Sequence, residues 1–326
     1  MTLRPVRLEP IFVPRIWGAR NLAPLFPDMK SLREPIGEVW LTGNDCRLAD
    51  GPFAGEKLGD AWPCMDEEWA GKRTRRDKSF PVLVKFLFPE DRLSVQVHPD
   101  DEYAAKNEAA AGGVGKTEMW YVIAARPGAE VRVGLQESTT REAFRRAIAE
   151  GNAEEHVERI AVRAGDAIFV PAGTVHTIGP GMILCEIQEN SDLTYRVFDY
   201  NRRTPEGKLR ELHVEKAMDV IRFGKQQGGK VAQGQDGDSS SEVAILADCP
   251  YFAVVKHSIS ESRYMVKPKG RLEIIVILEG RGKLCTNLSD ARIEYAPAEA
   301  WIIPAAVRDC VYDPEEATTL LSIAVP

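Results

Sequence analysis

Short apolar runs separated by glycine and proline dominate the hydrophobic pattern of this chain. Their length and their content of β-branched and aromatic residues are typical of strands. The pattern predicts strands at residues 81–88, 93–97, 118–124, 131–133, 166–170, 182–187, 252–259, 272–278, 283–286, 300–303 and 319–325. Many short strands at this spacing favour a β-sandwich or jelly roll over alternating strand–helix units.

Helical spacing of apolar residues is found in two segments. In residues 140–150, Phe144, Ala147 and Ile148 fall on one face of a helix, and residues 211–222 show a similar spacing. The sequence therefore predicts a mainly β protein with a small helical insertion.

One low-complexity stretch divides the chain. Residues 224–242 are rich in Gly, Gln and Ser and contain almost no apolar side chain. Such a segment cannot bury enough surface to offset the entropy of ordering it. We expect a flexible linker here, between a larger N-terminal catalytic unit, residues 1–223, and a smaller unit, residues 243–326.

A short internal repeat relates the two units. Residues 166–172, Asp-Ala-Ile-Phe-Val-Pro-Ala, align with residues 299–305, Glu-Ala-Trp-Ile-Ile-Pro-Ala, at an offset of 133 residues. At this offset His176 aligns with Asp309. The repeat indicates two copies of one β-fold, with the polar site residues in the first copy, so we expect the second copy to bind no metal.

Composition narrows the class of protein. The chain has 326 residues, 44% of them hydrophobic and 28% charged, which is typical of a globular protein and not of a disordered one. Its formal net charge of −7 is opposite to the basic bias of nucleic-acid binders. The longest aliphatic run, residues 274–278, is far shorter than the ~20 apolar residues of a membrane-spanning helix. We therefore expect neither nucleic acid nor membrane as a partner.

The cysteines and the N-terminal residues indicate a compartment. The six cysteines lie far apart and form no Cys-x-x-Cys pair, so we interpret them as small buried residues in a reducing environment. No basic region followed by an apolar stretch marks the chain for export. The sequence predicts a cytoplasmic protein.

Gln96 and His98 are the first candidates for chemistry. Side chains two apart on a strand point to the same face, so this pair offers an amide oxygen and an imidazole nitrogen to one point. Metal sites use both donors. For this segment alone, a half-buried histidine with an ordinary hydrogen bond is the simpler interpretation.

Two later segments strengthen the metal interpretation. Lys116 and Glu118 share one face at the start of a predicted strand. A Gly-Asp turn then leads into an apolar strand, and a Pro-x-Gly bend returns the chain at His176. The chain contains only five histidines, so two of them in such settings favour a functional role over a structural one.

These motifs together carry a family resemblance. The order Gln-x-His, Glu, then Gly-Asp and Pro-x-Gly-x-x-His resembles the two metal-binding motifs of the cupin superfamily. With the longer matches, the chain resembles the type I mannose-6-phosphate isomerase family, particularly its short bacterial form, over residues 8–220. The matching segments are residues 94–103, 115–121, 171–176 and 188–200. The resemblance implies two cupin (jelly-roll) barrels, the second one divergent.

The resemblance also implies a metal site and a reaction. One Zn²⁺ per chain would be held by Gln96, His98, Glu118 and His176, with the neutral amide of Gln96 either bound to the ion or just beside it. Nitrogen and oxygen donors without thiolate leave a Lewis-acidic ion with an exchangeable position. The implied activity is the interconversion of mannose 6-phosphate and fructose 6-phosphate through an enediol(ate), an aldose–ketose isomerisation.

Catalytic groups follow from what this reaction needs. Arg196 matches the arginine that the family places near the developing oxyanion, and a permanent cation suits that role. Lys116 is our candidate for proton transfer, provided that the nearby Zn²⁺ lowers the pKa of its ammonium group. Asp192, Glu189 and a metal-bound water remain alternatives for the base.

Substrate contacts are expected from four further side chains. Lys85 is a lone cation in an apolar strand and is costly to bury without a partner, which favours a role in phosphate binding. Other candidates for the phosphate are Ser94, Arg196 and Arg202. Trp17 could stack on the sugar ring, and Asp192 is expected to contact the substrate.

Two other functions remain open at this point. Cupins include iron- or nickel-dependent dioxygenases, but their first motif usually supplies two histidines where this chain has Gln96 and His98. A cupin that binds a sugar phosphate without converting it is the second alternative. We expect a monomer or a small homo-oligomer with a small-molecule sugar phosphate as its partner.

Overall fold

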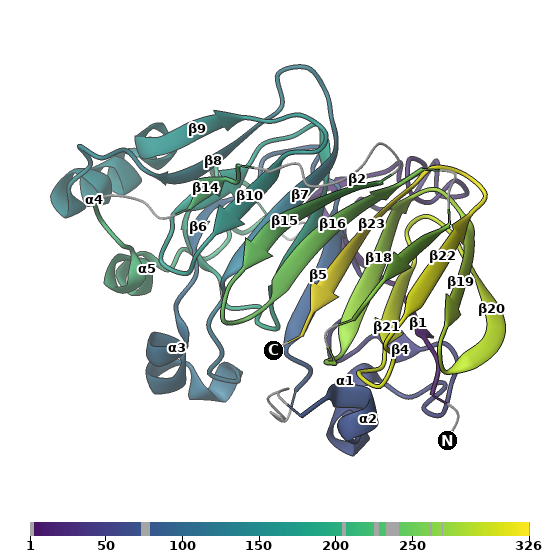
Figure 1. Cartoon of the computed structure of the whole chain (residues 1–326). Coiled ribbons are helices and arrows are strands. Elements are labelled where there is room, and N and C mark those ends of the chain that lie inside the picture. Colours follow the sequence, from purple (N-terminus) through teal and green to yellow (C-terminus); the bar gives the residue numbers. More distant parts are fainter. Residues whose placement is uncertain are drawn as a thin grey trace.

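The computed structural model describes residues 3–72, 79–203, 207–224, 228–232, 241–260, 263–268 and 270–325. Strands dominate and form two barrel-like units that lie side by side (Figure 1). In each unit a larger sheet and a smaller sheet pack their apolar side chains into a shared core. The mainly β architecture with two barrels is therefore confirmed.

The larger sheet of the first barrel is antiparallel and contains the strand that carries Lys85. Every residue of the strand that contains Lys85 is buried. Its apolar run therefore faces protein on both sides, which explains why it does not alternate with polar residues. In spatial order the sheet contains β14 (Gly229–Lys230), β10 (Ala167–Val170), β7 (Glu118–Ala125), β12 (Met182–Glu189), β5 (Val82–Leu87), β3 (Ile36–Trp40) and β2 (Ile11–Ala19).

The smaller sheet of the first barrel carries two of the predicted site residues, Gln96 and His176. Its strands supply Val131, Val133 and Ile178 to the core, against Leu87 and Trp120 of the larger sheet. In spatial order it contains β13 (Tyr195–Phe198), β6 (Val95–Val97), β11 (His176–Ile178), β8 (Glu130–Leu135) and β9 (Val157–Ala161).

The second barrel repeats this arrangement with fewer strands in its smaller sheet. Its larger sheet contains β15 (Ser241–Asp248), β16 (Ala253–Ile259), β23 (Thr318–Ala324), β18 (Glu273–Glu279), β21 (Ala300–Ile303), β1 (Val6–Glu9) and β4 (Arg47–Leu48). Its smaller sheet contains β17 (Tyr264–Val266), β22 (Cys310–Pro314), β19 (Gly282–Thr286) and β20 (Ser289–Tyr295).

Strand order and register support the internal repeat. The order β10–β7–β12–β5 in the first barrel corresponds to β21–β18–β23–β16 in the second. Val170 pairs with Glu118 in the first barrel, and Ile303 pairs with Glu273 in the second. Val170 and Ile303 are 133 residues apart, which is the offset of the sequence repeat. The register therefore places buried Glu273 where the first barrel has Glu118.

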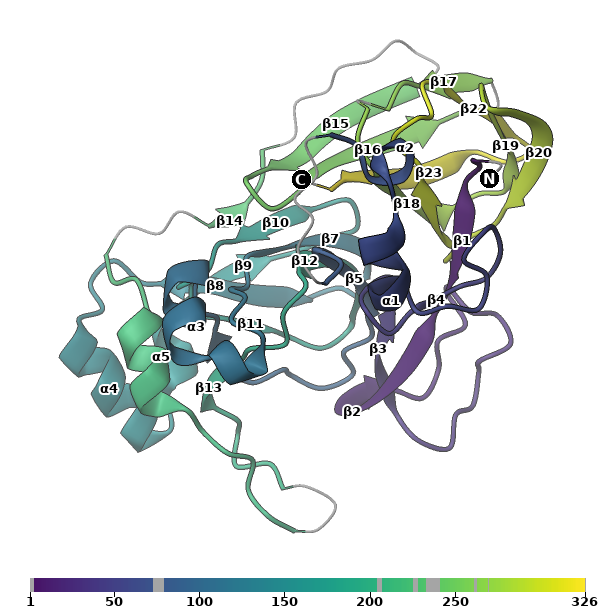
Figure 2. The same ribbon diagram turned by 90° about the horizontal axis from the view of Figure 1, so that it is seen from below.

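The N-terminal strand belongs to the sheet of the second barrel. Val6 on β1 pairs with Ile302 on β21, and Leu8 on β1 pairs with Leu48 on β4. The N-terminus accordingly lies beside the second barrel (Figure 2). The division into residues 1–223 and 243–326 stays a prediction. The pairing of β1 with β21 joins the two predicted units, because a strand from the first unit lies in a sheet of the second.

Helices are few and short among the described residues. They are α1 (Leu58–Ala61), α2 (Glu67–Ala70), α3 (Asp101–Asn107), α4 (Arg141–Glu150) and α5 (Val214–Val220), with 3₁₀ turns at Trp62–Cys64, Ala109–Ala111 and Ala153–His156. The prediction of a helix at 140–150 is confirmed, with Thr140 as its N-cap. The predicted helix at 211–222 was too long. It begins after His213, whose backbone is not helical, and it ends before Ile221, which is extended.

Two further expectations need correction. The thiols are free, as predicted, but Cys64 is exposed where we expected burial. Within the predicted linker, residues 225–227 and 233–240 lie outside the described residues, whereas Gly229 and Lys230 form β14 and pair with β10. That part of the segment is therefore attached to the first barrel.

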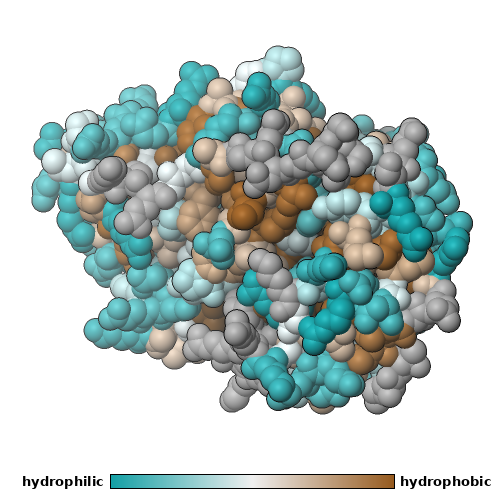
Figure 3. All heavy atoms as spheres, viewed as in Figure 1, coloured by the Kyte–Doolittle hydropathy of each residue, from teal (hydrophilic) through white to brown (hydrophobic). Residues whose placement is uncertain are grey.

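The surface is mostly hydrophilic on the face seen in Figure 1, with apolar atoms gathered near its middle, over β15 (Figure 3). Ile245 of β15 is 66% exposed. Among the described residues, no helix is both long and apolar enough to cross a membrane.

Candidate metal centre and adjoining pocket

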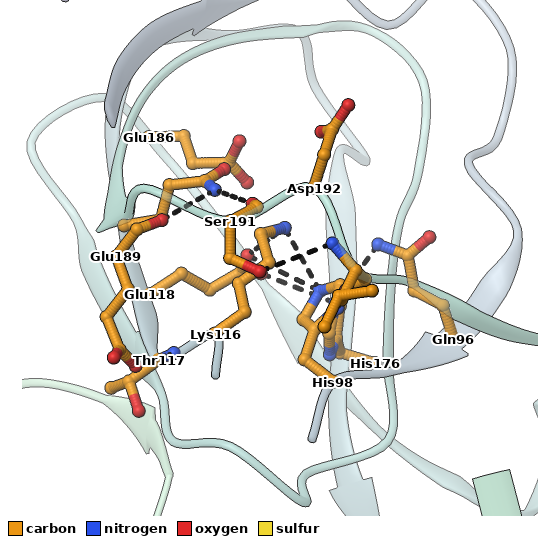
Figure 4. A network of polar contacts seen from close by, with 12 residues as sticks. Gln96, His98, Lys116, Thr117, Glu118, His176, Glu186, Glu189, Ser191 and Asp192 are labelled. Atoms are coloured by element: carbon orange, nitrogen blue, oxygen red, sulfur yellow. Dashed lines mark hydrogen bonds and ion pairs between the residues drawn. The ribbon is translucent and has the colours of Figure 1, made fainter. Parts of the chain in front are cut away.

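Three buried side chains from different strands converge inside the first barrel (Figure 4). His98 follows β6, Glu118 begins β7 and His176 begins β11. Their nitrogen and oxygen ligand atoms all lie within 4.8 Å of one another. The structure thus brings together three of the four residues that the sequence predicted as metal ligands.

The Pro-x-Gly bend before His176 has a steric basis. Gly173 has φ +83°, and a Cβ at this position would lie 2.9 Å from the carbonyl oxygen of Val220. Its backbone NH donates to the carbonyl oxygen of His98 at 2.8 Å. Only glycine adopts this left-handed conformation without strain at such close approach. The bend therefore links the chain segments that carry the two histidines.

A backbone carbonyl fixes the tautomer of each histidine. His98 Nδ1 lies 2.8 Å from the oxygen of Leu193, and His176 Nδ1 lies 2.9 Å from the oxygen of Thr174. Because a carbonyl can only accept, each Nδ1 carries the proton and each Nε2 directs a lone pair at the cluster. Burial lowers the pKa of both rings, and the charge of Lys116 lowers the pKa of His98 further. Both rings are therefore neutral, as metal binding requires.

Glu118 brings a negative charge to the same point. Its Oε1 lies 3.3 Å from His176 Nε2, and its Oε2 lies 3.5 Å from His98 Nε2. With neutral rings these are contacts between lone pairs, and the described residues give buried Oε1 no hydrogen-bond donor. A cation between the three groups would replace this repulsion with bonds. Two imidazoles and one carboxylate fit a zinc site with an open fourth position.

Lys116 lies next to two of these donor atoms. Its Nζ is 2.7 Å from Glu118 Oε2 and 3.1 Å from His98 Nε2. Burial alone would lower the pKa of Lys116, but the charge of Glu118 outweighs it and raises the pKa above its ordinary value. Lys116 is a protonated cation in this arrangement. It can act as a base only if a bound metal ion lowers its pKa, as the sequence analysis assumed.

Gln96 lies beside the cluster, opposite His176 in the strand register. Its Nε2 is 3.2 Å from His176 Nε2, and its Oε1 accepts a hydrogen bond from Ser94 Oγ at 3.0 Å. In this orientation the amide NH₂, not the oxygen, faces the cluster. Direct coordination by Gln96 therefore requires a rotation of the amide and stays a prediction.

A cavity of about 280 Å³ adjoins the cluster. Its lining includes Gln96 and most of the residues that the sequence predicted for catalysis or substrate binding, namely Trp17, Lys85, Ser94, Lys116, Asp192 and Arg196. Arg202, a further candidate for the phosphate, does not line it. Cavities of about 490 and 740 Å³ are found elsewhere, but they are lined by neither Gln96 nor Lys116, the two lining residues of the smaller cavity that contact the cluster. The cluster and the smaller cavity together form the candidate site.

Lys85 is surrounded by carboxylates inside this cavity. Its Nζ lies 3.5 Å from Glu186, 3.8 Å from Glu38 and 3.9 Å from Asp192, and the side chain is only 4% exposed. The buried lysine therefore has the partners that its apolar strand predicted it would need. Burial would raise the pKa of Glu38, but Lys85 and Arg15 outweigh it and lower the pKa to about 2.

Arg196 extends from β13 into the cavity. Its Nε donates to Ser94 Oγ at 3.2 Å and its Nη1 donates to the carbonyl oxygen of Glu211 at 3.1 Å. Burial, and then the positive charge of Arg210, lowers the pKa of Arg196. A hydrogen-bonded path therefore runs from His176 through Gln96 and Ser94 to this guanidinium.

The remaining predicted residues differ in accessibility. Trp17 is 4% exposed and packs in the barrel core, so only part of its ring borders the cavity. The Asp192 side chain is 68% exposed. Glu189 does not line the cavity, and its Oε1 accepts from the backbone NH of Thr117 at 2.6 Å.

Sequence reasoning missed four charged residues of the cavity, namely Arg15, Glu38, Glu186 and Arg210. For Glu186 a signal was available, since it is a lone carboxylate in the apolar run 182–187, as Lys85 is a lone cation in its strand. The two arginines lie in short segments, residues 15–18 and 210–213, that also resemble the family, but the sequence assigned neither of them a role.

Comparison with known proteins identifies the relatives of this chain. The sequence model described as "Phosphomannose isomerase type I, catalytic domain" matches residues 6–122, a span that includes Gln96, His98, Lys116 and Glu118. Mannose-6-phosphate isomerase ManA of Bacillus subtilis is 36% identical over 88% of this chain and 89% of its own length. Mannose-6-phosphate isomerase of Streptococcus mutans is 34% identical over 94% and 95% of the two chains.

Solved structures share the fold. The mannose 6-phosphate isomerase of Bacillus subtilis superposes with a TM-score of 0.88 at 30% identity, over 98% of this chain and 99% of that one. The enzyme of Salmonella typhimurium bound to its substrate, fructose 6-phosphate, and zinc superposes with a TM-score of 0.73 at 15% identity, over 98% and 99% of the chains. The close relatives cover nearly the whole length of both partners, and the chain therefore belongs to the type I mannose-6-phosphate isomerase family.

Proposed function

We propose that this chain interconverts mannose 6-phosphate and fructose 6-phosphate and binds one Zn²⁺ per chain at His98, Glu118 and His176. One observation carries the proposal: two neutral imidazole lone pairs and a buried carboxylate meet beside a cavity lined by cations. The relative from Salmonella typhimurium binds zinc and fructose 6-phosphate, which supports this choice of metal and substrate.

The reaction moves a proton between C2 and C1 of the sugar through an enediol(ate) intermediate. Bound zinc supplies a Lewis acid for the oxygen atoms of these carbons. Gln96 either completes the ligand set or hydrogen-bonds beside it, and its link to Ser94 limits how far the amide can move.

Arg196 is positioned to stabilise negative charge on the substrate. Its contacts with Ser94 and Glu211 hold it through two of its nitrogen atoms, which leaves Nη2 for the cavity. A guanidinium keeps its charge throughout the reaction, so it can stabilise an oxyanion without exchanging a proton.

Proton transfer has two candidates in the cavity lining, Lys116 and Asp192. Lys116 is held against Glu118, whereas Asp192 is exposed and borders Lys85. A pH–rate profile separates them. If Lys116 transfers the proton, Lys116→Arg will abolish turnover and Asp192→Asn will keep the wild-type profile.

A coupled assay tests the proposal. Fructose 6-phosphate formed from mannose 6-phosphate is measured before and after EDTA treatment, and again after Zn²⁺ is added back. We expect turnover to disappear with chelation and to return with zinc. A metal-loaded protein without turnover would contradict the proposal and leave the binding protein and the dioxygenase as the functions to test.

Two statements about the whole protein stay predictions from the sequence. These are its cytoplasmic location and its state as a monomer or small homo-oligomer.

A further inference from the structure

Two arginines to which the sequence analysis assigned no role line the cavity. Arg15 comes from β2, and Arg210 comes from the segment between β13 and α5. Neither has a hydrogen bond or ion pair with His98, Glu118 or His176 among the described residues. Their positions and partners indicate a second function within the cavity, apart from the metal centre.

Arg15 is held rigidly by a buried carboxylate. Its Nε and Nη2 donate to the two oxygens of Glu38 at 2.8 and 3.0 Å, and Trp40 Nε1 donates to Glu38 at 2.7 Å. The strand is irregular here, because Pro14 and Ala19 both pair with Ile36. Such an irregularity redirects side chains out of the ladder. The bidentate pair fixes the plane of the guanidinium, and Nη1 on its other side donates to the carbonyl oxygen of Pro14 at 3.4 Å.

Arg210 shares its carboxylate with another arginine. Its Nη1 donates to Asp199 Oδ1 at 3.1 Å, and Arg202 Nη2 donates to the same oxygen. The Asp199 side chain is 4% exposed. One buried carboxylate is therefore shared by two guanidinium groups, and Arg202 has a second carboxylate partner, Asp91, at 3.5 Å.

The arginines are also close enough to repel one another. Burial, and then the charges of Arg202 and Arg15, lowers the pKa of Arg210 against the opposing effect of Asp199. By contrast, Lys85 already faces three carboxylates and has little charge to offer a further anion. Of the two cavity arginines, Arg15 is paired with Glu38, whereas Arg210 shares its carboxylate with Arg202 and is the less compensated of the two.

We infer that Arg15 and Arg210 form the phosphate-binding pair of the cavity, an inference that rests on the proposed function. A phosphate monoester carries close to two negative charges and accepts paired hydrogen bonds from guanidinium groups. A hexose 6-phosphate carries this group at the end of the carbon chain opposite to C1 and C2. A binding pair apart from the metal centre therefore matches the shape of the substrate. Arg202 supports the pair through Asp199.

Two measurements on Arg15→Gln and Arg210→Gln test the inference. Titration calorimetry with inorganic phosphate measures anion binding without turnover, and steady-state kinetics give KM and kcat for mannose 6-phosphate. Each variant should weaken phosphate binding and raise KM by roughly tenfold to a hundredfold, the usual effect of losing a charged hydrogen bond, with kcat changed much less. Arg146→Gln, on the exposed side of α4, is the matched control and should behave as wild type.

The outcomes separate this inference from the proposed function. If both variants bind phosphate as tightly as wild type and keep its KM, the pair is not the phosphate site. If wild type binds phosphate and the variants do not, the inference holds even without turnover, and only the proposed reaction fails. Should Arg15→Gln unfold because Glu38 loses its partner, Arg210→Gln alone decides, and Arg15→Lys should restore folding but not full phosphate affinity.

Discussion

Backbone carbonyls, not side chains, orient the two histidines of the metal centre. Since Leu193 and Thr174 each hold one Nδ1 proton, the ring positions depend on the fold of two short segments. The backbone therefore orients both Nε2 atoms toward the proposed metal position, and neither ring needs a carboxylate to hold its Nδ1 proton. A substitution at the cluster should then affect metal binding directly, while one in the cavity should not.

His176→Ala and Arg196→Ala should separate these two effects. The first removes a ligand and should abolish metal retention, because two ligands hold zinc poorly. The second should keep the metal and lower kcat by about a hundredfold or more, the scale seen when one oxyanion donor is lost. Metal analysis after dialysis, with turnover of the same samples, checks both.

His156→Ala is the control, since His156 contacts Thr139 and lies outside the cavity. Near-normal turnover of Arg196→Ala would reject the oxyanion role.

Glu189 should make stability depend on pH. Burial, with nearby Asp101, raises its pKa from 4.5 to about 8. The folded state therefore keeps a proton that the unfolded state loses above pH 4.5, so this contribution to stability declines as the pH rises toward 8. Glu189→Gln cannot lose a proton, and its melting temperature relative to wild type should increase between about pH 5 and about pH 8.5.

The exposed Glu150→Gln, at the end of α4, provides the comparison and should track wild type. A constant difference between Glu189→Gln and wild type across this range would show that Glu189 ionises normally.

The sequence predicted His98, Glu118 and His176 through motifs that resemble those of a known family, and the structure brings the three together. It predicted only part of the cavity lining. Arg15 and Arg210 are brought together only by tertiary structure. Charge balance in the cavity depends on which side chains share a carboxylate, and local sequence does not contain that information.

At the scale of elements, the irregular pairing of β2 with β3 directs the side chains of Arg15 and Trp17 toward the cavity. Gly37 on β3 passes so close that a Cβ there would lie 2.5 Å from Arg15 Cβ and 2.7 Å from Trp17 Cζ3. Both contacts are far below ordinary carbon–carbon distances. The missing side chain of Gly37 therefore allows Arg15 and Trp17 to occupy their places.

Gly37→Ala should displace both side chains. We expect KM for mannose 6-phosphate to rise several-fold while the metal content stays at the wild-type level, because no ligand is touched. Kinetics and metal analysis of one preparation measure both quantities. Ile16→Ala, which truncates a 42% exposed side chain in the same irregular segment, should leave KM unchanged. Unchanged KM in Gly37→Ala would show that the strand accommodates the methyl group.

Strands were predicted well where apolar runs were continuous and poorly where they were not. Residues 182–187 and 272–278 correspond closely to β12 and β18, which lie inside their sheets. By contrast, β2 contains Pro14 and Arg15 and gave no recognisable run. The helices α1 and α2 are one turn each, too short for any periodicity.

At the scale of the whole molecule, one core joins the two barrels. A single cluster contains Val6, Phe86 and Cys185 together with Phe252 and Ile323. The second barrel also needs β1 and β4, both from the first fifty residues, at the edge of its larger sheet. The second barrel is therefore incomplete without the N-terminal segment.

A fragment of residues 241–326 should consequently aggregate when it is produced alone. It would expose the edge of β21 and the apolar surface that β1 covers. Co-expression with residues 1–232 should restore a soluble complex, which size-exclusion chromatography detects. A fragment that is monomeric and folded by itself would show that β1 contributes little.

The pairing of Val6 with Ile302 also has a consequence for synthesis. On the ribosome, β1 emerges well before its partner β21, which is translated almost three hundred residues later. During that interval the buried side chains of β1, Val6 and Leu8, lack the large sheet of the second barrel and must be kept from other nascent chains. The slowest step in folding this protein should therefore follow the synthesis of β21, when β1 joins it.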